Sequence, residues 1–272
     1  MIFKRYYRHP THLYKYMSFD VKGNYSDLLF NDTIYFSSPT NFNDPFDCGL
    51  DLNFKKKSRW YIKKHVFKIL SDQIPNLDGD QEKKAKKFIA ENLEDFNPEN
   101  IEIRKLLRKN LNDFISRTGI SCYSQIKDNI LMWSHYAKFH KGFCIEFNYK
   151  KLEDALVEFN RKNNVITYMD KVIYKKYYPT LSGYNNEDMV DSLFIKSSNW
   201  SFEKEWRMIY SEGNGLKITL PVSVISAIYL GLKIDSKNED TVKKALSLKK
   251  YRIDLYKAKK VVHQFALAFE KI

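Results

Sequence analysis

The chain is poor in the residues that interrupt or crosslink a protein. Its 272 residues include only 9 Gly, 7 Pro and 3 Cys. So little Gly and Pro excludes a collagen-like or low-complexity chain. The cysteines form no Cys-x-x-Cys pair and their number is odd, which argues against a disulfide framework. We therefore expect Cys48, Cys122 and Cys144 to be buried free thiols in a cytoplasmic protein.

The motifs of the common membrane, nucleotide and metal sites are missing as well. No stretch reaches the roughly 18 apolar residues of a transmembrane helix, and the basic N-terminus lacks the apolar core of a signal peptide. The sequence has no P-loop or Rossmann glycine pattern, no His-Glu-x-x-His and no Gly-x-Ser-x-Gly. None of the 6 histidines are spaced i, i+4 for zinc. We expect neither membrane insertion nor a metal site.

Aromatic residues and positive charge are plentiful. The 19 Tyr, 19 Phe and 4 Trp exclude a disordered chain, and the length suits one large domain or two small ones. The formal net charge of +13 would attract nucleic acid or an acidic protein partner. However, 37 of the 46 basic residues are Lys and 9 are Arg, and an A/T-rich genome would by itself favour Lys. The basic stretch 243–271 is either a solvated face or a site for an acidic partner.

The periodicity of the apolar residues changes twice along the chain. Alternation typical of strands precedes residue 53 and follows residue 117, whereas residues 53–117 have helical periodicity. We therefore predict a single α+β domain over residues 1–272, with a mixed or antiparallel sheet and a helical insertion at 53–117. The expected strands are 12–16, 33–37, 119–124, 142–147, 165–168, 171–174, 204–210, 216–220, 227–231, 251–256 and 264–269, with 204–210 and 216–220 joined by a turn. The expected helices outside the insertion are one capped by Ser18 or Asp20 that runs through Leu28 and Leu29, and those at 129–137, 187–196 and 240–248.

Two short motifs have both a structural and a chemical interpretation. Asn43-Asp44-Pro45-Phe46-Asp47 is dense in turn formers and predicts a rigid corner with a Phe anchor. Met132-Trp133-Ser134-His135-Tyr136, on a short helix, would place aromatic rings and one imidazole where a flat substrate ring could stack. Alternatively, these rings belong to the core and His135 bonds to a backbone carbonyl.

The third motif, residues 199–207, carries the densest set of charges. If residues 203–207 are extended, Glu203, Glu205 and Arg207 share one face of a strand, while Trp206 lies on the opposite, buried face with Phe202 and Met208. The Arg would keep one carboxylate ionised, and crowding of the two acids would raise the pKa of the other. Such carboxylate pairs serve glycosidic chemistry. The alternative is a surface ladder of ion pairs.

In their order and spacing these motifs resemble the bacterial domain-of-unknown-function family 2971. The resemblance extends from residue 13 to about residue 210 and assigns no reaction. It rests on residues 13–16, 34–39, 42–46, 122–124, 132–136, 141–142 and 202–207.

The order of the motifs also resembles the ADP-ribosyltransferase superfamily, whose members split NAD at the nicotinamide–ribose bond. The resemblance implies a superfamily-like sheet, NAD as substrate, and Glu205 or Glu203 as the catalytic carboxylate with Arg207 beside it. The chain departs from the superfamily because Lys15 or Tyr16 stands where Arg or His is usual, and the Ser-Thr-Ser motif is missing. The resemblance implies that NAD is bound by Tyr14, Lys15, Tyr16, Ser37, Asn43, Asp44, Ser124, Trp133, His135 and Tyr136.

Three functional hypotheses follow. The first is an NAD-consuming ADP-ribosyltransferase-like toxin or anti-phage effector that modifies nucleic acid or protein. The second is a nucleic-acid binder or a nuclease without NAD, in which Asp44, Asp47, Glu203 and Glu205 would converge on a metal ion. The third is a non-enzymatic interaction module of a defence system. The first predicts that the Glu pair, His135, Tyr136 and Tyr16 converge on one cleft.

Overall fold

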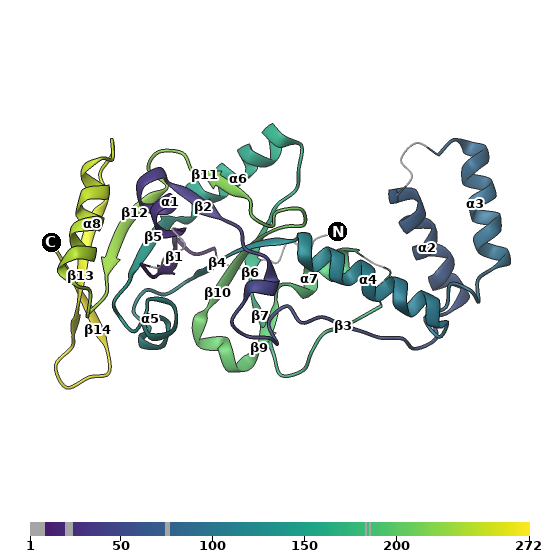
Figure 1. Cartoon of the computed structure of the whole chain (residues 1–272), viewed down its shortest axis with the longest axis horizontal. Helices are drawn as coiled ribbons and strands as arrows, with labels where there is room; N and C mark the ends of the chain where they lie inside the picture. Colours follow the sequence, from purple (N-terminus) through teal and green to yellow (C-terminus); the bar gives the residue numbers. More distant parts are fainter. Residues whose placement is uncertain (1–8, 20–23, 74–76, 183, 185) are drawn as a thin grey trace.

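The centre of the molecule is one eight-stranded sheet, seen in a computed structural model that describes residues 9–19, 24–73, 77–182, 184 and 186–272 (Figure 1). The strands run in the order β14-β13-β12-β5-β1-β4-β10-β6, and every pairing is antiparallel except β12 with β13. This confirms an α+β fold with a large, mixed sheet. The strand bounds are β1 His12–Met17, β4 Gly119–Ser124, β5 Phe143–Asn148, β6 Tyr168–Lys171, β10 Glu205–Tyr210, β12 Ile225–Leu230, β13 Asp254–Lys260 and β14 Leu267–Lys271.

Helices and three short strand pairs surround this sheet. The strand pairs are β2 (Thr33–Tyr35) with β11 (Lys217–Thr219), β3 (Asp51–Leu52) with β8 (Thr180–Leu181), and β7 (Ile173–Lys175) with β9 (Ile195–Ser197). The helices are α1 (Asn24–Asn31), α5 (Ile130–Tyr136), α6 (Tyr149–Asn163), α7 (Asn186–Ser192) and α8 (Ser236–Ser247), with two 3-10 helices, η1 (Pro39–Asn41) and η2 (Ser198–Glu203).

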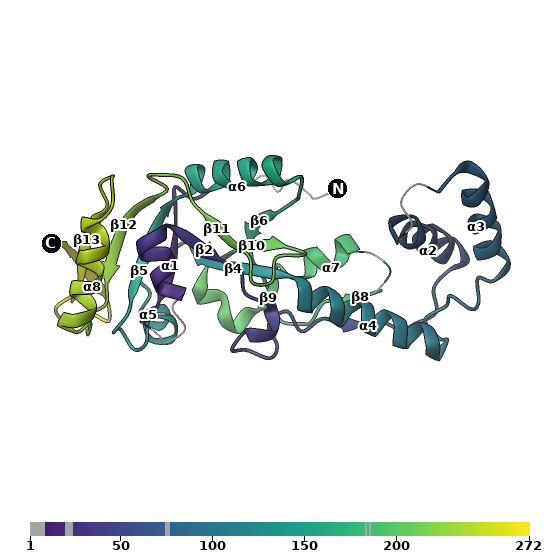
Figure 2. The ribbon, with the colours of Figure 1, turned by 45° about the horizontal axis from the view of Figure 1, so that its top comes forward.

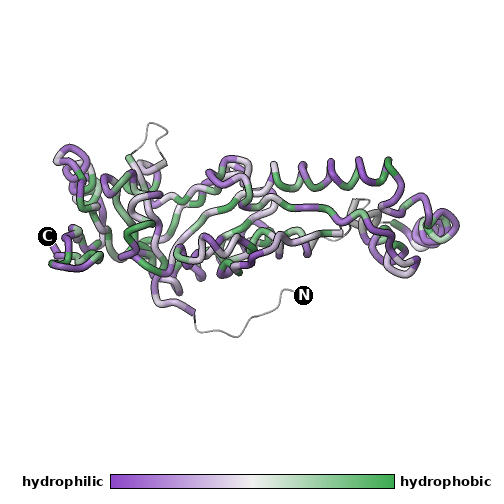
Figure 3. The backbone as a smooth tube through the Cα atoms, turned by 90° about the horizontal axis from the view of Figure 1, so that it is seen from below, coloured by the Kyte–Doolittle hydropathy of each residue, from purple (hydrophilic) through white to green (hydrophobic). Residues whose placement is uncertain are grey.

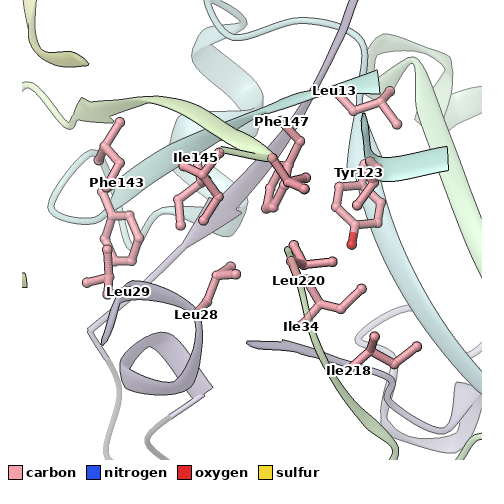
Figure 4. Close-up of a cluster of buried hydrophobic side chains, with 14 of the residues drawn as sticks. Leu13, Leu28, Leu29, Ile34, Tyr123, Phe143, Ile145, Phe147, Ile218 and Leu220 are labelled. Carbon is pink, nitrogen blue, oxygen red and sulfur yellow. The ribbon is translucent and has the colours of Figure 1, made fainter. Parts of the chain in front are cut away.

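One face of the sheet carries the main hydrophobic core. Alternate residues of β5, namely Phe143, Ile145 and Phe147, point to this face and are fully buried, because successive side chains of a strand project to opposite sides. They pack against Leu28 and Leu29 of α1 (Figure 4). The β2–β11 pair and helices α6 and α8 complete this layer. The opposite face of the sheet packs against α5 and a second core, and it also carries the polar residues described below.

The segment 53–117 forms the helices α2 (Arg59–Gln73), α3 (Gly79–Glu91) and α4 (Ile101–Arg117). Asp78 begins α3 with a capping box to Gln81, and Asn100 caps α4. Buried residues of α4, Leu107 and Leu111 among them, join a second core that includes Ile209 of β10. Helices α2 and α3 lie at the end of the molecule opposite α8 and the C-terminus (Figures 1 and 2). These two helices project from the sheet as a lobe, and most of their residues are hydrophilic (Figure 3).

Three elements differ from the sequence-based expectations. Helix α6 was not predicted, although Tyr149, Leu152 and Leu156 follow a helical period and face the main core. The predicted helix 187–196 is wrong at its end, because α7 stops at Ser192 and residues 195–197 are strand β9. Strand β11 does not form a hairpin with β10 but pairs with β2. Long-range pairing decided the last two cases, and local periodicity carries no information on it.

Candidate functional site

Strand β10 places two of the predicted charged residues on one face of the sheet. Glu205 pairs with Ser124 of β4 and Arg207 pairs with Cys122, so all four side chains project to the face opposite the main core. Trp206 and Met208 project into the main core as predicted, whereas Phe202 packs on the other side, near α5. Glu203 is not in the strand, because it ends η2 and Lys204 follows it in the left-handed region at φ 46°. That turn still directs the Glu203 side chain towards Glu205.

Five buried residues form what we call the charge cluster: Asp47, Lys196, Glu203, Glu205 and Arg207. Arg207 Nη2 donates to Asp47 Oδ1 and Oδ2 at 2.8 and 2.7 Å, and its Nε donates to Glu205 Oε1 at 2.7 Å. Lys196 Nζ lies 2.6–3.2 Å from a carboxylate oxygen of each of the three acids. Their exposed fractions are between 0% and 8%, so the alternative of a surface ion-pair ladder is wrong.

The cluster holds three carboxyl groups against two cations, so charge balance favours one protonated acid. Burial, followed by repulsion from Glu205, raises the pKa of Glu203 to about 7. Burial also disfavours ionised Glu205, but Arg207 and Lys196 outweigh burial and lower its pKa to about 2. Near neutral pH Glu205 is therefore ionised, whereas Glu203 exists in both its protonated and its ionised form.

Glu203 and Glu205 line a cavity of about 200 Å³ under the sheet face. Rings of Tyr14, Tyr16 and Tyr136 form much of its wall, and the Tyr136 hydroxyl donates to Glu203 Oε1 at 2.5 Å. Of the predicted site residues, the cavity brings together Tyr14, Lys15, Tyr16, Asn43, Ser124, Tyr136, Glu203 and Glu205. We call this space the carboxylate cavity.

Lys15 lies where β1 and β4 separate. The two strands pair only at Tyr14 and Ser124, and further along β4 Ile120 exchanges hydrogen bonds with Ser37 instead. In the gap, Lys15 Nζ donates to Cys122 O at 3.0 Å and to Ser121 Oγ at 3.1 Å. Burial lowers its pKa. The Lys15 ammonium group also lies 4.8 Å from the centroid of the Tyr123 ring, and Glu205 attracts its charge.

A second cavity of about 300 Å³ adjoins the first and contains Ser37. The two cavities share Lys15, Tyr16, Phe42, Cys122 and Tyr136 as lining residues. The predicted Ser37 therefore lies beside the carboxylate cavity rather than inside it. Together the two spaces reach the range of roughly 300–1,000 Å³ that is usual for small-molecule sites.

Besides Ser37, four of the predicted residues lie outside the carboxylate cavity. Trp133 is fully buried, donates to Lys127 O at 2.7 Å and packs edge-on against Tyr16, so it belongs to the core. His135 is exposed, its ring contacts those of Trp200 and Phe202, and it does not line the carboxylate cavity. Among the described residues we find no backbone carbonyl bonded to its ring. Arg207 lies beneath the cavity floor with an exposed fraction of 0%.

The fourth residue, Asp44, lies on a neighbouring groove. Its Oδ1 accepts from the Phe46 backbone N–H at 2.9 Å, which is the corner expected of this motif. Phe46 does not anchor that corner in the core, because its exposed fraction is 67%. Asp44 Oδ2 instead accepts from Trp200 Nε1 at 2.6 Å and so joins the corner to η2.

Two members of the charge cluster carried little or no signal in the sequence. Asp47 ends the turn motif and was singled out only for a metal site, and no pattern marked Lys196. The acids predicted to converge on a metal ion do not do so. Lys196 Nζ lies between Asp47, Glu203 and Glu205, and Asp44 accepts a hydrogen bond from Trp200 instead. Within the described ranges no group of three or more His, Cys, Asp or Glu side chains is placed to hold a metal ion.

Comparison with known proteins confirms one of the two resemblances. Residues 132–208, which include most of α5, all of η2 and the catalytic candidates of β10, match a family described as "Protein of unknown function (DUF2971)". The match is narrower than the span of motifs in the sequence. No curated protein and no solved structure matches the chain. None of the described helices is long and apolar enough to cross a membrane.

Proposed function

We propose that the protein is an NAD-consuming enzyme of the ADP-ribosyltransferase kind, with a sheet and cleft arranged as in that superfamily. The observation that carries the proposal is a pair of carboxyl groups with opposite pKa shifts, facing one cavity walled by tyrosine rings. Such a pair provides a lasting negative charge and an exchangeable proton site at the same place. Both are needed to transfer a ribosyl group.

Glu205 would supply the lasting charge. Arg207 and Lys196 keep its pKa at about 2, although burial opposes this, so Glu205 is ionised throughout the physiological range. As the nicotinamide C–N bond breaks, its electron pair leaves with neutral nicotinamide and positive charge develops on the ribose. A fixed carboxylate nearby stabilises that oxocarbenium-like charge without reorganisation.

Glu203 would handle the proton. An acceptor O–H or N–H attacks the ribose C1 and must lose its proton. A carboxyl group with a pKa of about 7 is well matched to receive it. The Tyr136 hydroxyl, which donates to Glu203, holds the carboxyl group in position. The rings of Tyr14, Tyr16 and Tyr136 would stack on nicotinamide, and Lys15 would attract the phosphates.

The direct test is release of nicotinamide from NAD labelled in that ring. The purified protein is incubated with NAD alone, then with DNA, RNA or cell lysate as a source of acceptor. We expect release, with a loss of at least about 100-fold in Glu205→Gln, since removing one stabilising group of this kind typically costs that much. Glu158→Gln, which changes an exposed carboxylate on α6, is the matched control and should retain full activity.

Two results would contradict the proposal: no release under any of these conditions, or full release by a folded Glu205→Gln variant. Either would favour the remaining hypotheses, a nucleic-acid binder without NAD or an interaction module. In both of those the charge cluster would only hold β9, η2 and β10 together.

A further inference from the structure

A second open groove lies on the other side of the Asn43–Asp47 corner. It has a volume of about 460 Å³ and is formed by the corner, the segment after β7, and η2. Its aromatic lining residues are Phe46, Tyr177, Tyr178 and Trp200. The exposed fractions of the first three are 67%, 76% and 43%, which is unusual for side chains that normally contribute to cores. We call this feature the aromatic groove.

Two of the rings, those of Trp200 and Tyr178, are held in place by hydrogen bonds at their edges. Asp44 accepts from Trp200 Nε1 at 2.6 Å, and the Tyr178 hydroxyl donates to Phe46 O at 2.7 Å. The Phe46 and Tyr178 ring centroids lie 6.2 Å apart. With their polar atoms satisfied in this way, these rings can offer apolar surface to a ligand. The groove is thus a built surface rather than a chance cluster of exposed residues.

The charges of the groove select for an anionic ligand. Lys175 and Lys176 line it and are exposed, and Lys176 Nζ lies 5.6 Å from the centroid of the Tyr177 ring. Asp44 is the one carboxylate among its described lining residues, and both of its oxygens already accept hydrogen bonds. Aromatic rings with ammonium groups beside them match the bases and phosphates of a nucleic-acid chain.

The aromatic groove and the carboxylate cavity are neighbours. Lys196 lines both, and Asp47 borders the cavity while the next residue, Cys48, borders the groove. Trp200 and Glu203, one in each space, belong to the same short helix η2. A chain bound in the groove would therefore pass close to the two carboxyl groups.

From these observations we infer that the aromatic groove binds the bases of a single-stranded nucleic acid and presents it to the carboxylate cavity as the acceptor. The binding rests on the groove alone, whereas the role as acceptor rests on the proposed function. The net charge of +13 would assist the encounter, but the specific claim concerns the rings and the two lysines beside them.

The experiment measures binding of fluorescein-labelled 20-nucleotide single strands, one DNA and one RNA of the same mixed sequence, by fluorescence anisotropy. An abasic strand of the same length carries the phosphates without the bases. We expect the base-containing strands to bind at least tenfold more tightly than the abasic strand. Tyr177→Ala should weaken them by roughly five- to hundredfold, the range found for loss of one base–ring stack, and leave the abasic strand unaffected. Phe265→Ala, which removes an exposed ring in the turn between β13 and β14, is the control.

A second pair of variants tests the charges. Lys175→Gln/Lys176→Gln should weaken every strand and reduce the dependence of affinity on salt concentration, because fewer counterions are released. Lys237→Gln/Lys244→Gln, at exposed positions of α8, removes the same charge away from the groove. This control should change affinity and its salt dependence only as far as the lower net charge does.

Equal affinity for abasic and base-containing strands, or no effect of Tyr177→Ala, would overturn the inference. So would tight binding of double-stranded DNA in preference to both single strands. If an acidic peptide displaces the bound strand, and the Tyr177→Ala variant also fails to bind that peptide, the groove is reassigned to a protein partner. NAD cleavage is assayed separately. If base-dependent binding is found but NAD is not cleaved, the proposed function is rejected and the inference about binding in the groove stands. If NAD is cleaved but base-dependent binding is absent, only the inference about the groove is rejected.

Discussion

Removing Arg207 should destabilise the protein far more than removing a surface arginine. Arg207 has an exposed fraction of 0% and donates to Asp47, to Glu205 and to the Leu193 carbonyl, the last at 2.6 Å. In Arg207→Met, the three acids would face Lys196 alone. Breaking a buried pair by removing one partner costs about 3–5 kcal/mol because a charge is left buried without compensation. This is about a fifth or more of the roughly 5–15 kcal/mol by which domains are stable.

The assay is urea unfolding at pH 7, followed by tryptophan fluorescence and by circular dichroism to check that the transitions coincide. Arg161→Met is the matched control, since Arg161 pairs with Glu158 on the surface of α6 and its side chain is 75% exposed. We expect its unfolding midpoint to equal that of the wild type. Adding Asp47→Asn to Arg207→Met removes one of the uncompensated acids and should recover at least about 1 kcal/mol.

A loss below about 1 kcal/mol in Arg207→Met would refute the reasoning, since it would mean that water or rearrangement compensates the acids. A loss equal to that of Arg161→Met would do the same. If Arg207→Met does not accumulate in folded form, the double variant still gives a measurable midpoint to compare with Asp47→Asn alone.

Three further predictions concern the cluster and the core. The pKa of Glu203 is raised from 4.5 to about 7, so its contribution to stability is complete below pH 4.5 and is lost as the pH rises through 7. The free energy of unfolding should therefore fall over this pH range in the wild type but not in Glu203→Gln. An unchanged fall in the variant would contradict this prediction. The hydrogen bond from the Tyr136 hydroxyl favours ionised Glu203, so Tyr136→Phe should move the midpoint of this loss of stability to higher pH. An unmoved midpoint would exclude the hydrogen bond. Leu152→Ala in α6 should cost about 2–5 kcal/mol in urea unfolding because Leu152 is fully buried, whereas Val157→Ala, 60% exposed on the same helix, should cost less than about 0.5 kcal/mol.

Local sequence patterns predicted much of the sheet. Strands β1, β4, β5 and β10 lie within one or two residues of their expected bounds, because alternation of apolar and polar side chains is a property of neighbouring residues. The same alternation predicted that Glu205 and Arg207 share a face. Helix α6 was within reach of this reasoning, since its apolar residues follow a helical period after the capping residue Asn148.

The positions of single residues in α5 were beyond such reasoning. Trp133, His135 and Tyr136 are almost adjacent in sequence, yet one is in the core, one is exposed, and one contacts Glu203. Which side of a short helix faces a cavity depends on how the helix docks on the sheet. The motif therefore predicted aromatic packing near the site, but not which ring reaches it.

By itself, then, the sequence determined the alternating pattern of the α+β fold and the common face of Glu205 and Arg207. Only the tertiary structure decided that Asp47 of the turn motif and Lys196 of β9 would contact those two residues. Their approach depends on contacts between residues up to 160 positions apart. The tertiary structure also buries the face of the sheet that carries Glu205 and Arg207, and this burial separates the pKa values of Glu203 and Glu205. A charge pattern specifies which groups are present, but only their distances and their removal from water set how strongly they interact.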